Sequence, residues 1–155
     1  MNKVAKLILA FAFASGLTSV VANAQVLPGK HPGYLHSLTD LRTARWYLFH
    51  QPGDAKVYEG EDAAIREVEA AIGDIKKAAA DDGKDLNDHP NVDVHEHGSR
   101  LLKAIESLKK ARADIEGEED NPDVRDLRHR AFEHIDKAIK GAEHAHDAWL
   151  KEQKN

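Results

Sequence analysis

The sequence contains no cysteine, and its single methionine is Met1. The absence of cysteine excludes disulfides, thiolate metal sites, covalent haem attachment and lipoprotein anchoring, and the absence of an internal methionine excludes His/Met haem ligation. The chain also lacks a Gly-x-Ser-x-Gly motif, a phosphate-binding glycine-rich loop and the His-Glu-x-x-His motif of zinc proteases. We therefore expect a protein that is not an enzyme.

Residues 1–24 have the features of a cleaved signal peptide. A start with two lysines precedes an apolar stretch, which ends in the small-residue signal Ala22-Asn23-Ala24. A signal anchor is the alternative, but it would need about 20 apolar residues and no cleavage site. We expect cleavage after Ala24 and one periplasmic or secreted domain over residues 25–155. Loss of the two lysines shifts the formal net charge from −5 to −7, which disfavours nucleic acid and anionic membranes as partners.

Four segments carry apolar residues at spacings of three and four, which is the pattern of an amphipathic helix. The four stripes are Tyr34, Leu35, Leu38, Leu41, Ala44 and Leu48; Ile65, Val68, Ile72 and Ile75; Leu101, Leu102, Ile105, Leu108, Ala111 and Ile115; and Val124, Leu127, Phe132, Ile135, Ile139 and Trp149. Proline and glycine punctuate the chain between the stripes, and no segment alternates as a strand does. We predict an all-α, up-down-up-down four-helix bundle.

The two halves of this bundle resemble each other. Residues 34–79 align without a gap on residues 101–146 at a constant offset of 67, which matches Leu41 with Leu108 and Ala44-Arg45 with Ala111-Arg112. Any two amphipathic helices align partly through their periodicity, but here both helices and the turn between them share one offset. We predict a duplicated helical hairpin and pseudo-two-fold symmetry.

Two arginines at matching positions, Arg45 and Arg112, lie on or beside the apolar stripes. A guanidinium in such a place needs water or a carboxylate. Folding each hairpin about its turn brings Arg45 near Glu59, Glu61 and Asp62. In the second half it brings Arg112 near Asp126. We expect two equivalent structural ion pairs.

The longest connection carries the strongest candidate for a metal site. Its potential ligands are His89, Asp93, His95, Glu96 and His97. Imidazole and carboxylate groups together suit Zn²⁺, Cu²⁺ or Ni²⁺, and a loop allows ligands two residues apart to converge. The alternative is that aspartate and asparagine residues cap the next helix while the histidines are solvated. A weaker set of metal ligands on the last helix consists of His129, Glu143 and His146.

The segment RAFEHIDKAIKGAEHAHDAW resembles the repeats of small exported metal-binding proteins, which are histidine-rich helical bundles without cysteine. This resemblance implies binding of divalent cations such as copper, nickel and iron through surface histidines. The segment HPGYLHSLTDLRTARWYL is similar to a broader set of small exported bacterial helical proteins. Two functions therefore stay open: an interaction or structural module that docks an unknown envelope protein, and weak binding of transition metals.

Overall fold

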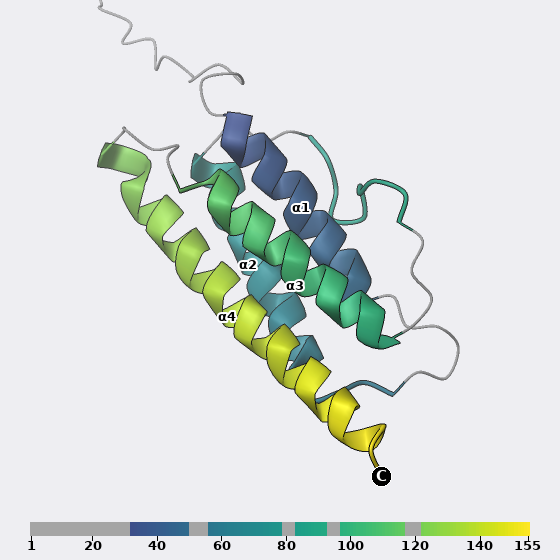
Figure 1. Cartoon of the computed structure of the whole chain (residues 1–155). Helices are drawn as coiled ribbons and strands as arrows, with labels where there is room; N and C mark the ends of the chain where they lie inside the picture. Colours follow the sequence, from purple (N-terminus) through teal and green to yellow (C-terminus); the bar gives the residue numbers. More distant parts are fainter. Residues whose placement is uncertain (1–31, 50–55, 79–82, 93–96, 117–121) are drawn as a thin grey trace, which may run out of the picture.

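Figure 1 shows the chain as a computed structural model, which describes residues 32–49, 56–78, 83–92, 97–116 and 122–155. They form four helices, α1 (Pro32–Phe49), α2 (Glu61–Ala78), α3 (His97–Asp114) and α4 (Pro122–Glu152). These residues contain no β-strand, so the predicted all-α four-helix bundle is confirmed. Within the same ranges, no helix is long and apolar enough to cross a membrane.

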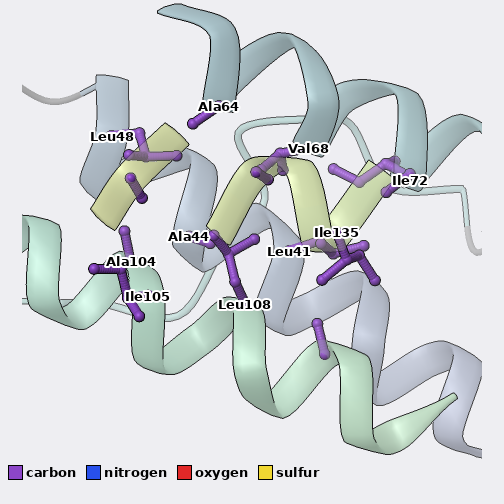
Figure 2. Packing of buried hydrophobic residues seen from close by; sticks show 14 of the residues in the cluster. Leu41, Ala44, Leu48, Ala64, Val68, Ile72, Ala104, Ile105, Leu108 and Ile135 are labelled. Atoms are coloured by element: carbon purple, nitrogen blue, oxygen red, sulfur yellow. The ribbon is translucent and has the colours of Figure 1, made fainter. Parts of the chain in front are cut away.

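The interior of the bundle is built from the predicted apolar stripes. Leu41, Val68, Leu108 and Ile135, one from each helix, lie close together in the centre of the core (Figure 2), and none of their surfaces is exposed. Each aliphatic side chain of this size contributes about 1.5–3 kcal/mol when it is fully buried. Apolar burial therefore stabilises the bundle in a chain that has no disulfide.

The directions of the helices differ from the predicted up-down-up-down order, because α3 runs parallel to α2. His97, the first residue of α3, contacts Glu61, the first residue of α2, with 3.0 Å between His97 Nε2 and Glu61 Oε1. Arg100 then donates a hydrogen bond to the carbonyl of Tyr47 near the end of α1. Helices α1 and α4 therefore run one way and α2 and α3 the other. Each helix packs against two antiparallel neighbours, α1 against α2 and α3, and α4 against the same two.

A crossover segment, residues 83–92, explains these directions because it runs along α1 (Figure 1). Arg42 Nη2 donates to the carbonyl of Lys84 over 3.4 Å, and the His89 ring lies 5.3 Å from the Trp46 ring. The segment thus advances along α1 toward the end at which α3 begins. The sequence identified this connection as the longest one, but the predicted order treated it as a turn between antiparallel neighbours.

The two predicted arginine ion pairs are present and equivalent, although their partners are different from those predicted. Arg45 Nε lies 2.7 Å from Glu69 Oε1, and Arg112 Nε lies 2.7 Å from Asp136 Oδ1. The two arginines and the two carboxylates are each separated by the same offset of 67. The partners predicted for Arg45 lie too near the start of α2. Arg45 instead pairs with Glu69, further along α2, while the first residue of α2, Glu61, contacts His97 of α3.

A further contact relates the two halves of the bundle. Glu67 on α2 and His134 on α4 are equivalent under the offset of 67, and Glu67 Oε2 lies 2.5 Å from His134 Nδ1. Contact between equivalent residues on antiparallel helices is expected where a two-fold axis passes between them. The packing of α2 on α4 thus agrees with pseudo-two-fold symmetry, while the duplication of an ancestral hairpin stays a prediction.

Candidate functional site

The predicted metal loop lies only partly within the described structure. Asp93, His95 and Glu96 lie outside the described residues. His89 donates a hydrogen bond from Nδ1 to the carbonyl of Pro90 over 2.7 Å, and its ring packs against Trp46. His89 is therefore part of the contact between the crossover segment and α1.

His97, the fifth predicted ligand, belongs to a buried polar cluster at the end of the bundle where α2 and α3 begin. Its Nε2 lies 3.0 Å from Glu61 Oε1, and its Nδ1 lies 2.8 Å from Arg100 Nη2. Glu61 and Arg100 are each 1% exposed. Glu61 Oε1 also accepts a hydrogen bond from the backbone N–H of Tyr58, which satisfies a donor just before α2. The cluster joins α2 and α3 to the end of α1, where Arg100 binds Tyr47.

The partners of His97 determine where its proton lies. A guanidinium only donates hydrogen bonds, so Nδ1 of His97 accepts from Arg100 and carries no proton. Nε2 therefore holds the proton and donates it to the Glu61 carboxylate. Burial lowers the pKa of Arg100, and the nearby Glu61 carboxylate opposes that shift. A metal ion would have to displace one of these two partners, so the geometry assigns His97 a structural role.

The weaker set of predicted ligands on α4 does not converge. His129 and Glu143 are fourteen residues apart on one helix, a separation of about 21 Å at the usual helical rise. His129 lies 3.4 Å from Glu133, and Glu143 is paired over 3.2 Å with Lys109 of α3. His146 stacks on Trp149 at 5.8 Å between ring centroids. Across the described part of the chain, no group of three or more histidine, aspartate or glutamate side chains is arranged to hold a metal ion.

A carboxyl pair lies between α1 and α3, and the sequence analysis missed it. Burial and the facing carboxyl of Asp114 raise the pKa of Asp40 above its ordinary value of 3.8. Lys110 and His36 oppose this shift only in part. The signal was hidden because Asp40 and Asp114 are far apart in sequence and meet only when α1 and α3 pack antiparallel.

An exposed apolar side chain, Leu102, lies on the outside of α3. A hollow of about 450 Å³ is lined entirely by residues of this helix, Leu102, Ile105, Glu106, Lys109, Lys110 and Ala113, which we call the α3 outer face. The sequence placed Leu102 in the core stripe, but Leu102 is 52% exposed, whereas its neighbour Leu101 is buried. Consecutive helical residues point about 100° apart, so both leucines cannot face the core centre.

The comparisons with known proteins found no matching family model, no similar curated protein and no similar solved structure.

Proposed function

We propose that this chain is a non-enzymatic interaction module of the cell envelope, and that it docks a protein partner through the α3 outer face. The observation that supports this proposal is the exposure of Leu102 beside an apolar hollow. Large apolar side chains that line a hollow and are rimmed by charged groups are typical of protein interaction sites. Lys109, Lys110 and Glu106 supply such a rim.

The other polar groups favour this reading because they are used to hold the bundle together. Glu61, His97 and Arg100 bind one another and join the ends of three helices. Glu67 and His134 link α2 to α4. These contacts leave the alternative, weak metal binding, without support from the described residues.

The location in the envelope follows from the expected signal peptide and is proposed together with the function. Production of the full chain in a bacterial host tests it by intact mass. The exported product should begin at Gln25, whereas a product that keeps residues 1–24 would contradict the proposed location.

Site-specific photo-cross-linking in the producing cell tests the docking function. A benzoylphenylalanine in place of Leu102 should yield a discrete adduct with another protein, since this side chain lies at the proposed contact. The same group in place of Val57 is the matched control, because Val57 is 47% exposed and does not line the α3 outer face. The second variant Lys109→Glu should abolish the adduct. Identical adducts at both positions, or none at 102, would contradict docking through α3.

A further inference from the structure

The crossover segment shows how a peptide is held on one half of this bundle. Two cationic side chains, Arg42 of α1 and Lys76 of α2, donate hydrogen bonds to the same backbone carbonyl, that of Lys84, over 3.4 and 2.7 Å. The side chains of Leu86 and Val92 pack against the core at the same time. The bound segment is neither helix nor strand, and it covers the second half of α1.

The equivalent surface on α3 has no such cover in the described structure. Under the offset of 67, Arg42 corresponds to Lys109 and Thr43 to Lys110, both of which line the α3 outer face. Arg42 is fully buried beneath the crossover segment, whereas the Lys109 side chain is 59% exposed. The same comparison holds for Thr43, which is 9% exposed, and Lys110, whose side chain is 60% exposed. The two halves therefore resemble each other in their buried residues, but the outer side of α1 is covered and the equivalent side of α3 is exposed.

The segment that would fill the equivalent position on α3 lies almost entirely within the expected signal peptide. The crossover segment precedes α3 and covers α1. Under the offset of 67, residues 16–25 precede α1 in the same way, and the pseudo-two-fold relation would place them over α3. Nearly all of them precede the expected cleavage site after Ala24. A chain cleaved after Ala24 would lack nearly all of this segment, so the proposal assigns the cover to another molecule.

From this asymmetry we infer that the α3 outer face binds a short, non-helical, acidic segment of a partner protein, seated on α3 as the crossover segment is seated on α1. The inference rests on the proposed docking function and names the kind of partner. The crossover segment itself carries two aspartates and one lysine together with its apolar anchors. On the receiving side, Lys109 and Lys110 outnumber the single carboxylate Glu106, and Leu102 and Ala113 provide exposed apolar area.

The size of the surface favours a peptide over a second copy of the chain. From Leu102 to Ala113 the helix rises about 17 Å, and a helix is about 10 Å wide. Such a stripe is much smaller than the roughly 800 Å² per partner that a stable dimer usually buries. A segment of about ten residues is long enough to follow it, because an extended residue spans about 3.3 Å.

Lys109 is the residue whose contacts would change on binding. It is paired with Glu143 over 3.2 Å in the uncovered structure, and Glu143 is equivalent to Lys76 of the first half. The equivalent Arg42 uses its charge on a peptide carbonyl. On binding, Lys109 would donate to a carbonyl of the incoming segment in the same way.

The test uses the exported, processed protein labelled with ¹⁵N and a synthetic peptide of the crossover sequence, GKDLNDHPNV. Addition of the peptide should shift the amide signals of residues 102–113 in a saturable manner. Leu102→Ser should weaken binding about fivefold through lost apolar contact, while the matched control Val57→Ser should leave it unchanged. A peptide with asparagine at both aspartate positions should bind about threefold more weakly, since it lacks the acidic groups.

Three outcomes would overturn the inference: no shifts on α3 at millimolar peptide, equal shifts with a scrambled peptide, or equal affinity for the acidic and the amide peptide. The cross-linking experiment at position 102 separates this failure from failure of the proposed function. A discrete adduct at 102 without binding of the acidic peptide would retain docking through α3 but reject this class of occupant. Absence of both would reject both.

Discussion

The close approach of α2 to α4 gives a sharp prediction for Gly60. The φ angle of Gly60 is +105°, a conformation that side chains disfavour, and a Cβ atom there would lie 2.5 Å from the backbone oxygen of Gly141 on α4. A non-glycine residue at positive φ costs about 1–3 kcal/mol. The clash is with backbone in a packed interface, so overpacking adds about 1–3 kcal/mol. Gly60→Ala should therefore lower the free energy of unfolding by about 2–6 kcal/mol.

Two other glycines provide matched controls. Gly83 also has positive φ, +71°, but a Cβ atom there meets nothing within 4 Å, so Gly83→Ala should cost only the backbone term of about 1–3 kcal/mol. Gly73 lies inside α2 with open space around it, and Gly73→Ala should stabilise the protein by about 0.5–1 kcal/mol through helix propensity.

Urea denaturation followed by circular dichroism at 222 nm measures all three variants on one scale. The informative quantity is the difference between Gly60→Ala and Gly83→Ala, because both share the conformational cost and only the first has the contact with α4. A difference smaller than about 0.5 kcal/mol would refute the close packing of the start of α2 on α4. It would also remove one of the contacts that place these helices side by side.

Two further predictions concern the polar groups. The raised pKa of Asp40 means that the folded state disfavours its ionised form, so this group's contribution to stability is present below about pH 3.8 and is lost as pH rises through the folded-state pKa. Asp40→Asn should therefore raise the melting temperature at pH 7, and this gain should vanish near pH 3; an equal effect at both pH values would contradict the facing pair with Asp114. His97→Ala should destabilise the fold by about 2–4 kcal/mol in urea denaturation, because it leaves buried polar groups of Glu61 and Arg100 without their partner. Calorimetric titration with Zn²⁺ should show no difference between this variant and the wild type, whereas normal stability with lost zinc binding would show that His97 is a ligand.

Hydrophobic periodicity was sufficient to predict the four helices and most of their buried faces. Spacings of three and four residues report directly which side of a helix avoids water, and Leu41 and Leu108 are buried as predicted. The same pattern contains no information on helix direction, which depends on where the connecting segment travels. The predicted order was wrong for α3 because the crossover segment binds α1 through Arg42 and Trp46, two contacts between residues about 42 positions apart.

The candidate site was harder to predict than the fold. Leu102 is apolar and next to Leu101, so composition alone places both in the core, and only the packing shows that one of them is exposed. The histidines had the opposite problem. Their residue type suggests metal, but His97 and His134 each lie within hydrogen-bonding distance of a carboxylate on α2, and the sequence pattern does not show these long-range pairings.

The two hairpins differ in how their outer surfaces are covered, and this difference is the reason for proposing the docking surface on α3. Both halves pack around one core, so the same packing constrains their helices. Arg45 and Arg112 accordingly keep equivalent partners. Arg42 is covered by the crossover segment, whereas the equivalent Lys109 lies open beside the exposed Leu102. Exposing an apolar side chain gives up the stabilisation that its burial would provide. A partner that covers this face would recover that stabilisation on binding, which is the physical basis for placing the docking surface there.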